Sequence, residues 1–212
     1  PLCHSYQTKC FFNARDKNME RDFFHCGNCD MVFVPRNFHL TIDAQLERYL
    51  SHNNDPSDPE YRKFLARLSD AILPSLKEGA QGLDFGAGPG PALAIMLREK
   101  NMIVDIWDPL FFSDKSVLNH IYDFITCTET AEHFSDPAKE FTLINSMLQP
   151  TGTLGVMTGM IESWDDFPDW YYHRDPTHIC FYSKQTMVWI SEYFSWKLKF
   201  PVPNVTLFHK PA

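Results

Sequence analysis

The chain has 212 residues, a formal net charge of −8 at pH 7, 44% hydrophobic residues and 15% aromatic residues. This composition can build a core, which excludes global disorder, and the length fits one α/β domain with a small appendage. The acidic balance, without a Lys or Arg cluster, argues against nucleic acid as the main partner. No apolar run reaches the roughly 20 residues that span a bilayer, and no signal peptide opens the chain, so a cytoplasmic location is expected.

Four of the six cysteines lie in the first 30 residues, at Cys3, Cys10, Cys26 and Cys29. Without signs of secretion, cysteines are more typical of metal ligands and buried thiols than of disulfides. The stretch ERDFFHCGNCDMVFVP predicts two short strands around a C-x-x-C turn, which is the pattern of a zinc knuckle. Residues 1–38 are therefore expected to form a small zinc-ribbon-like β-hairpin module, with Cys3, Cys26 and Cys29 as metal ligands.

The remaining zinc ligand is not fixed by this pattern. The segment PLCHS has the form of the second half of a C-P-x-C knuckle, whose first cysteine would fall immediately before Pro1. His4, Cys10 or His25 are the substitutes within the chain. The alternative is a hairpin that holds reduced thiols and no metal.

Residues 39–79 are expected to form a helical extension before the main domain. Asp58 is placed to cap a helix whose first turn carries Pro59, and apolar residues follow at helical spacing over 61–77. Pro74 is expected to end or kink this helix early, because proline lacks the N–H that a helix interior needs.

From residue 80 to 212, strand and helix patterns alternate. This order predicts an α/β fold, with a Rossmann-like, doubly wound and mostly parallel sheet. Strands are expected at 81–85, 103–107, 122–127 and 154–158, helices at 91–100, 136–148 and 183–193, and closing strands near 196–200 and 205–209.

The stretch GLDFGAGPGPALAIML joins a strand to a helix through a glycine-rich turn. A dinucleotide site requires G-x-G-x-x-G/A, but the third position is Pro91, and a triphosphate loop requires a lysine that is absent here. Asp84 in the strand would repel pyrophosphate and attract an ammonium group. Asp108 ends the second strand, where a carboxylate can accept both hydroxyls of a ribose. A ligand with a ribose, an amine and no phosphate is S-adenosylmethionine.

Four motifs in this order resemble the class I S-adenosylmethionine-dependent methyltransferases: LDFGAGPG, DIWDP, YDFITCTETAEHFSDP and LQPTGTLGVMT. The likeness covers residues 83–200 and is nearest to the ubiquinone-biosynthesis type, with its E-H pair, a following D-P and an LKPGG-like turn. It implies methyl transfer to a small-molecule acceptor of unknown identity. The oligomeric state is left open.

The resemblance also assigns roles to residues. The methionine end of the methyl donor would lie on Asp84, Gly86, Ala87, Gly88 and Gly90, with the ribose on Asp108. Thr128 and Glu129, just after Cys127, would lie beside the sulfonium and the acceptor entrance. Only fourteen residues separate Asp108 from Asp123, where the family places a helix and a strand. Pro109, Leu110 and Phe111 would then supply an apolar face for the adenine.

The densest group of polar and aromatic residues is DDFPDWYYHRDPTHICFYS, which follows the fifth strand. Its length and aromatic content predict a lid over the acceptor, with Tyr172, His173 and His178 facing the methyl group. His133 and His178 are the first candidates for a general base, since the pKa of histidine is about 6.5, and Tyr172 is a further catalytic candidate. The alternatives are a protein of this fold that binds S-adenosylmethionine without turnover, and an NAD-dependent oxidoreductase.

Overall fold

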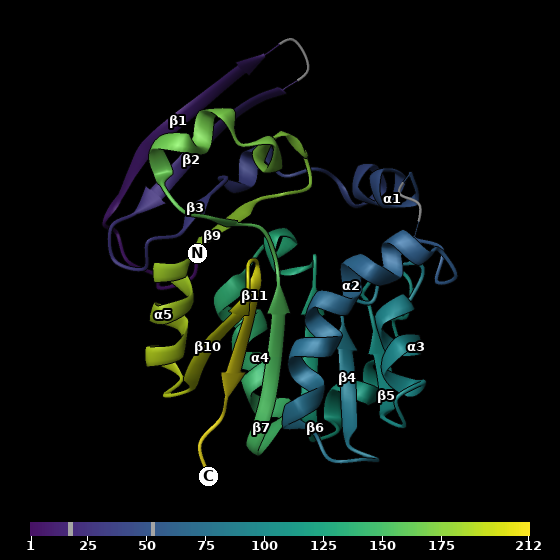
Figure 1. Ribbon diagram of the computed structural model, residues 1–212. Helices are drawn as coiled ribbons and strands as arrows, with labels where there is room; N and C mark the ends of the chain where they lie inside the picture. The colour runs from purple at the N-terminus through teal and green to yellow at the C-terminus, as the bar shows by residue number, and fades with distance from the viewer. Residues whose placement is uncertain (17–18, 52–53) are drawn as a thin grey trace.

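The computed structural model describes residues 1–16, 19–51 and 54–212. Its lower half in Figure 1 is built on a six-stranded sheet with the order β10-β11-β7-β6-β4-β5. Strands β5, β4, β6 and β7 run parallel, β11 pairs antiparallel with β7, and β10 pairs antiparallel with β11. The strands are β4 (Gln81–Phe85), β5 (Ile103–Trp107), β6 (Tyr122–Thr128), β7 (Leu148–Met157), β10 (Lys197–Val202) and β11 (Val205–His209).

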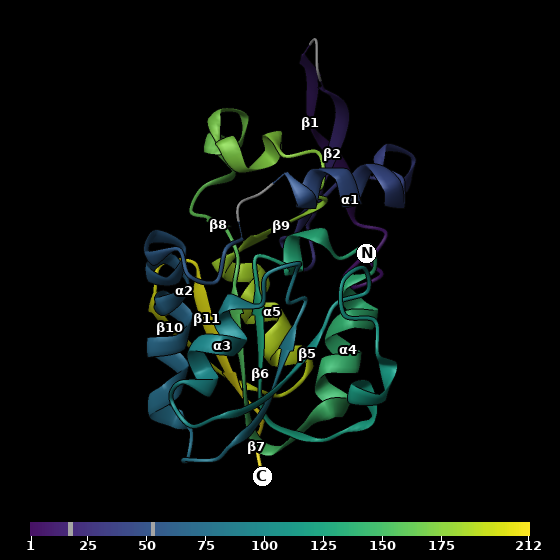
Figure 2. The ribbon, with the colours of Figure 1, turned by 90° about the vertical axis from the view of Figure 1, so that its right-hand side faces the viewer.

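Helices cover both faces of this sheet and enclose two separate cores. On one face, Leu68 of α2 and Leu97 of α3 are buried with Phe124 of β6, and on the other Phe141 of α4 and Ile190 of α5 are buried together. Figure 2 shows α3 and α4 on opposite sides of the strands. The predicted doubly wound, Rossmann-like fold is therefore confirmed. The helices are α1 (Ile42–Leu50), α2 (Pro59–Ile72), α3 (Ala92–Arg98), α4 (Pro137–Met147) and α5 (Lys184–Tyr193).

Side chains near the two ends of helix α2 explain where it begins and ends. The Asp58 carboxylate accepts a hydrogen bond from the Glu60 N–H at 2.9 Å, and Pro59 occupies the first turn. The helix ends at Ile72, and Pro74 lies in the short 3-10 turn η2 (Leu73–Ser75). The cap and the early end at proline confirm the prediction. Within the described ranges, no helix is long and apolar enough to cross a membrane.

The connection between β5 and β6 is short, as the residue spacing predicts. It holds the 3-10 helix η3 (Lys115–Asn119) and the isolated bridge between Asp108 and Phe112, where the usual helix and strand would stand. Strand β5 therefore lies at the edge of the sheet.

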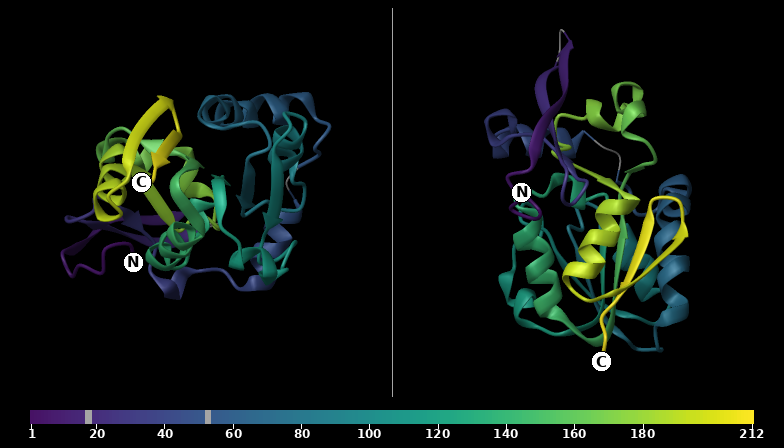
Figure 3. Two further views of the ribbon diagram at one scale, coloured as in Figure 1. Left: turned by 90° about the horizontal axis from the view of Figure 1, so that it is seen from below. Right: turned by 90° about the vertical axis from the view of Figure 1, so that its left-hand side faces the viewer.

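A second sheet stands above the carboxyl ends of the first and joins two distant parts of the chain. Its order is β1-β2-β3-β9-β8, and Val32 of β3 pairs with Phe181 of β9. The hairpin around the C-x-x-C turn is confirmed, and β1 adds a strand that the sequence did not indicate. Figure 3 shows the N-terminal hairpin of β1 and β2 projecting beyond the main sheet. The strands are β1 (Thr8–Asp16), β2 (Met19–Cys26), β3 (Val32–Phe33), β8 (Met160–Ile161) and β9 (Cys180–Ser183).

This second sheet crosses the predicted boundary at residue 38. The segment expected to be an irregular lid instead supplies β8 and β9, with the 3-10 helices η5 (Trp164–Asp169) and η6 (Tyr171–Arg174) between them. The N-terminal residues therefore share one sheet and one apolar core with the segment that follows β7. The division into a zinc-ribbon-like module (1–38), a helical extension (39–79) and a methyltransferase domain (80–212) stays a prediction.

Candidate active site

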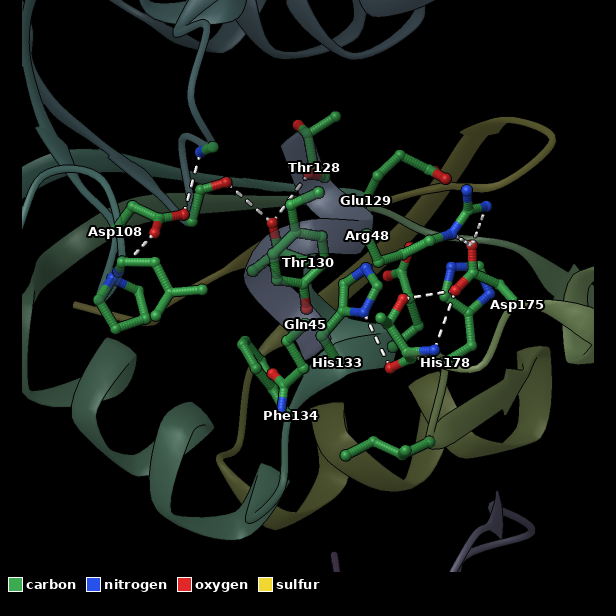
Figure 4. Close-up of a pocket in the computed structure, with 18 of the residues that line it drawn as sticks. Gln45, Arg48, Asp108, Thr128, Glu129, Thr130, His133, Phe134, Asp175 and His178 are labelled. Carbon is green, nitrogen blue, oxygen red and sulfur yellow. Dashed lines mark hydrogen bonds and ion pairs between the residues drawn. The ribbon is translucent and has the colours of Figure 1, made fainter. Parts of the chain in front are cut away.

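A cavity of about 940 Å³ opens at the carboxyl ends of β4, β5 and β6. Its walls come from the glycine turn, from residues 107–111 and 128–135, from α1 and the start of α2, and from residues 171–179. In an open parallel sheet this is the edge where ligands bind, because the loops of neighbouring strands diverge there. Figure 4 shows side chains from these elements around the cavity.

The glycine turn leaves room for a ligand on the cavity side. Gly86 and Gly88 have φ values of +81° and +62°, a region that residues with a Cβ atom rarely adopt. A Cβ added to Gly88 would meet no atom within 4 Å, whereas one on Gly86 would collide with Thr130. Gly86, Ala87 and Gly88 line the cavity. Gly90 is not among the lining residues, and its Cβ would collide with the carbonyl of Asn54.

Asp108 connects the glycine turn to the loop after β5. One carboxylate oxygen accepts the Gly88 N–H at 3.0 Å, and the other accepts the N–H groups of Leu110 and Phe111 at 2.8 and 3.1 Å. The side chain lines the cavity and is 8% exposed. Three backbone bonds leave part of the acceptor capacity of its two oxygens free. Pro109 lines the cavity beside it.

Asp84 lies outside the cavity, under the turn. Its carboxylate is buried in the sheet and accepts a hydrogen bond from the Thr126 hydroxyl at 2.8 Å. Burial raises the pKa of this carboxyl to about 6. Asp84 is therefore placed to hold the β4–β6 pair beneath the turn, and direct contact with a ligand in the cavity is not supported by its position.

Two buried polar groups on the cavity wall have no partner among the described residues. These are the indole N–H of Trp107 and the hydroxyl of Thr128. An unsatisfied buried donor or hydroxyl costs about 1–3 kcal/mol, so such groups mark places where a ligand or water completes the hydrogen bonding. Sequence reasoning missed Trp107, because a tryptophan at a strand end is more often a packing residue.

Glu129 follows β6 in a strained backbone conformation, with φ of +46°. It lines the cavity and is half-buried. Burial, followed by the charge of Glu132, raises the pKa of the Glu129 carboxyl to about 9. At neutral pH this side chain is therefore protonated in the protein without ligand.

The Tyr172 hydroxyl is engaged in a buried network behind the cavity wall. It donates to the Glu132 carboxylate at 2.5 Å and accepts the Gly159 N–H at 3.0 Å. Thr158 donates to the other Glu132 oxygen at 2.8 Å, and Glu132 is fully buried. Tyr172 therefore helps to fix the Glu132 side chain, and the Tyr172 hydroxyl is not free for proton transfer.

His133 and His178 both line the cavity and lie against each other, with ring centroids 4.9 Å apart. The Nδ1 atom of His133 lies 3.0 Å from the Thr177 carbonyl, and that of His178 lies 2.8 Å from the Tyr172 carbonyl. Because a carbonyl only accepts, each Nδ1 carries the proton and each Nε2 is unprotonated when the ring is neutral. The Nε2 atom of His133 lies 4.0 Å from a Glu132 oxygen. Burial lowers the pKa of His178, which favours that neutral form.

His173 turns away from the cavity, contrary to the expectation that it faces the methyl group. Its side chain is 4% exposed and stacks on Phe167 at 5.0 Å between centroids. Its Nε2 atom lies 3.2 Å from the Pro168 carbonyl. The packing of η5 and η6 against the N-terminal hairpin decides this orientation, and His173 is removed from the list of candidate bases.

Two clusters of side chains could hold a metal ion. Cys3, Cys26 and Cys29 bring three thiols together within 4.8 Å, with 3.4 Å between the sulfurs of Cys3 and Cys26. The substitutes named for the fourth ligand, His4, Cys10 and His25, are not part of this group. Glu132, His133 and His178 form the second cluster, at the cavity wall.

Helix α1 supplies part of the cavity wall that the sequence did not reveal. Gln45, Arg48 and Tyr49 line the cavity, and Arg48 forms an ion pair with Asp175 at 2.7 Å. The Tyr49 ring packs edge-on against His133 at 5.3 Å. The sequence of this segment carries only a polar helical pattern, so its position over the cavity depends on tertiary contacts.

Several solved structures resemble this chain. A SAM-dependent methyltransferase from Archaeoglobus fulgidus matches with a TM-score of 0.54 and 19% identity, over 70% of this chain and 94% of that chain. An O-methyltransferase family protein from Burkholderia thailandensis matches with a TM-score of 0.49 and 13% identity, over 80% and 68%. The PH0226 protein from Pyrococcus horikoshii matches with a TM-score of 0.48 and 14% identity, over 78% and 99%. At these identities the first match shows a shared fold.

The family is shown by sequence comparison. No curated protein gives a significant match. A family model described as a methyltransferase domain matches residues 54–198, which is most of the chain and includes the glycine turn, Asp108 and the Glu132–His133 pair. The chain therefore belongs to the methyltransferase-domain family, and it shares its fold with a SAM-dependent methyltransferase.

Proposed function

We propose that the cavity binds S-adenosylmethionine along the glycine turn and Asp108, and that a small-molecule acceptor binds between Glu129 and the two histidines. The observation that carries this proposal is the open space over Gly88, next to the part of the Asp108 carboxylate that backbone N–H groups leave free. The Trp107 and Thr128 groups without partners lie on the same wall. These groups fit a ligand that has hydroxyls and a polar end.

Within this proposal, each residue has a stated task. Asp108 accepts the ribose hydroxyls, Gly86, Ala87 and Gly88 let the backbone approach the methionine end, and Thr128 and Glu129 border the sulfonium. Pro109 offers an apolar surface for the adenine. Asp84 and Gly90 act from outside the cavity by shaping the turn. The Glu132–His133 pair and the Asp136–Pro137 helix start support an assignment to the ubiquinone-biosynthesis type.

The methyl donor supplies an electrophilic methyl group and a neutral thioether as leaving group. The protein must hold the acceptor atom in line with that methyl group and exclude water. For a hydroxyl acceptor, the Nε2 atom of His178 takes the proton while the new bond forms, and His133 is the second candidate. Tyr172 keeps Glu132 in place and acts as a positioning residue.

Calorimetry with S-adenosylmethionine and with NADH distinguishes the proposed function from its alternatives. We expect one binding site for S-adenosylmethionine and no measurable heat with NADH. Incubation of a metabolite extract with methyl-labelled donor is then expected to label a small molecule. Binding of the donor without any labelled product in extracts would favour a protein that binds it without turnover, and binding of NADH alone would favour an oxidoreductase.

We further propose that Cys3, Cys26 and Cys29 hold one structural zinc ion. Three thiolates at this separation match three corners of a tetrahedral site, whose zinc–sulfur distance is about 2.3 Å. The described residues supply three ligands. A fourth ligand would close the site, and the ion would then stabilise the knuckle and take no part in methyl transfer.

The zinc proposal predicts that Cys26→Ser combined with Cys29→Ser removes one equivalent of zinc per chain. Elemental analysis of the purified protein measures this directly. Cys10→Ser is the matched control, because Cys10 is an exposed cysteine of the same hairpin outside the cluster, and it should retain the zinc. Wild-type protein without zinc would leave the metal-free hairpin as the correct interpretation.

A further inference from the structure

Arg21 of β2 reaches from the N-terminal hairpin into the segment that carries His178. Its side chain is 4% exposed. One terminal nitrogen, Nη1, donates to the carbonyls of Pro176 and His178 at 3.1 and 3.0 Å. The other, Nη2, donates to the carbonyls of His173 and Asp175 at 2.5 and 2.9 Å.

Burying a charged guanidinium costs free energy unless its hydrogen bonds offset the loss of water. Burial lowers the pKa of Arg21 to about 10, and its Nε–H has no partner among the described residues. Its four hydrogen bonds go to neutral carbonyls rather than to a carboxylate. The planar fork of arginine suits this task, because its donors point in fixed directions that a lysine ammonium cannot reproduce.

Two carbonyls of this segment that Arg21 does not contact orient the two histidines. Tyr172 O lies 2.8 Å from His178 Nδ1, and Thr177 O lies 3.0 Å from His133 Nδ1. Each peptide unit is planar, so fixing the carbonyls of His173, Pro176 and His178 restricts the directions of the neighbouring ones. The segment therefore has little freedom to turn the carbonyls of Tyr172 and Thr177 away.

A second contact ties the same segment to α1. Arg48 donates to one Asp175 oxygen at 2.7 and 3.1 Å, and the other oxygen accepts the N–H and hydroxyl of Thr177. The bonds to Asp175 fix the position of Thr177, while Arg21 fixes the carbonyls of the residues before and after Thr177. Removal of Arg48 leaves the four Arg21 bonds in place, so the two contacts are separable.

We infer that Arg21 is a positioning residue of the active site, which holds residues 172–178 so that both histidines carry the proton on Nδ1 and present an unprotonated Nε2 to the acceptor side. This inference rests on the proposed function in its assignment of His133 and His178 as the bases. It makes the N-terminal hairpin part of the catalytic machinery, although the hairpin itself contributes no group that touches the acceptor.

The tautomers can be measured without knowing the acceptor. Nitrogen-15 NMR of histidine-labelled protein distinguishes a protonated Nδ1 from a protonated Nε2, and His133→Asn and His178→Asn variants assign the two rings. We expect the wild type to show both rings with the Nδ1 proton at pH 8. In Arg21→Gln, we expect a mixture of tautomers for at least one ring, with S-adenosylmethionine affinity changed less than threefold.

Arg15→Gln is the matched control, because it removes a guanidinium from the neighbouring strand. That guanidinium bonds to the Asp22 carboxylate and to the carbonyl of Arg21, and within the described part of the chain it makes no hydrogen bond to residues 172–178. It should retain wild-type tautomers. Arg21→Lys keeps the positive charge but loses the planar arrangement of donors. It should show the same mixture of tautomers as Arg21→Gln, and it serves as the test variant if Arg21→Gln does not fold. Wild-type tautomers in a folded Arg21 variant would overturn the inference, as would failure of both variants to fold, which would make Arg21 a stability residue only.

The result is separable from the test of methyl transfer. If labelling from the donor fails but the tautomers change as expected, the positioning role stands and the assignment of the histidines as bases falls. If labelling succeeds and the tautomers do not change, the proposed function stands and the role of Arg21 falls.

Discussion

Replacing Asp108 with alanine is expected to weaken S-adenosylmethionine binding at least a hundredfold. The carboxylate accepts N–H bonds from Gly88, Leu110 and Phe111, so its removal leaves three backbone donors without their partner. Each unsatisfied donor costs about 1–3 kcal/mol if it stays buried, and the turn and the loop relax to avoid that cost. The proposed ribose contact is lost at the same time. A hundredfold loss corresponds to about 2.7 kcal/mol.

Calorimetric titration with the donor measures this change, and thermal unfolding shows whether the fold survives. Asp114→Ala is the control, because Asp114 is an exposed carboxylate in the same connection whose hydrogen bonds cap η3. It should bind the donor like the wild type. An Asp108→Ala variant that folds and binds the donor within threefold of the wild type would remove Asp108 from the cofactor site.

Much of the main domain could be predicted from the sequence because its signals are local. The strand at 81–85 and the helix start at Asp58 depend on residues within a few positions, and both appear as expected. The spacing between Asp108 and Asp123 correctly indicated that a helix and a strand are missing. Such features need no knowledge of distant contacts.

The second sheet could not be predicted, because its pairing is non-local. Strand β3 pairs with β9, which lies almost 150 residues further along the chain, and both strands are short. A two-residue strand has no measurable period. The role of Arg21 was invisible for the same reason, since its four acceptors all lie in residues 173–178.

The side-chain directions within the candidate site also depended on packing. Strand β4 is buried on both faces, so the sequence gives no alternation that would show Asp84 turning into the sheet. His173 and His178 lie five residues apart in an irregular segment, where no fixed period relates them. The His173 ring packs against Phe167 and against an aromatic ring of the N-terminal hairpin, whereas His178 Nδ1 hydrogen-bonds to the carbonyl of Tyr172.

The affinity for S-adenosylmethionine is expected to rise with pH between about 6.5 and 8.5, and Glu129 is expected to cause a large part of the rise. In the free protein, burial and the charge of Glu132 raise the pKa of Glu129 to about 9, so the carboxyl is protonated over this range. A sulfonium beside it favours the carboxylate, so binding releases a proton. By linkage, the release of one proton increases affinity about tenfold per pH unit below that pKa.

Glu129→Gln removes this titration while keeping a neutral side chain of similar size. We expect the slope of log affinity against pH to fall by about one unit relative to the wild type. The amino group of the donor also titrates near pH 8, with a pKa of about 7.7–8.0 for such groups, but it affects both proteins equally. The difference between the two slopes therefore isolates Glu129. Glu162→Gln, at an exposed position outside the cavity, should keep the wild-type slope.

The stability of the free protein gives an independent check on the same group. A carboxyl whose pKa is raised by folding binds its proton more tightly in the folded state. Stability is therefore lost as pH rises from the unfolded pKa, about 4.3, towards 9. Glu129→Gln should raise the thermal midpoint at pH 8 by several degrees and change it little at pH 4, since 1 kcal/mol corresponds to a shift of about 2–4 °C in a protein of this size. Equal pH slopes for binding, together with unchanged midpoints at pH 8, would show that Glu129 is ionised in the free protein and would overturn the expected pH dependence.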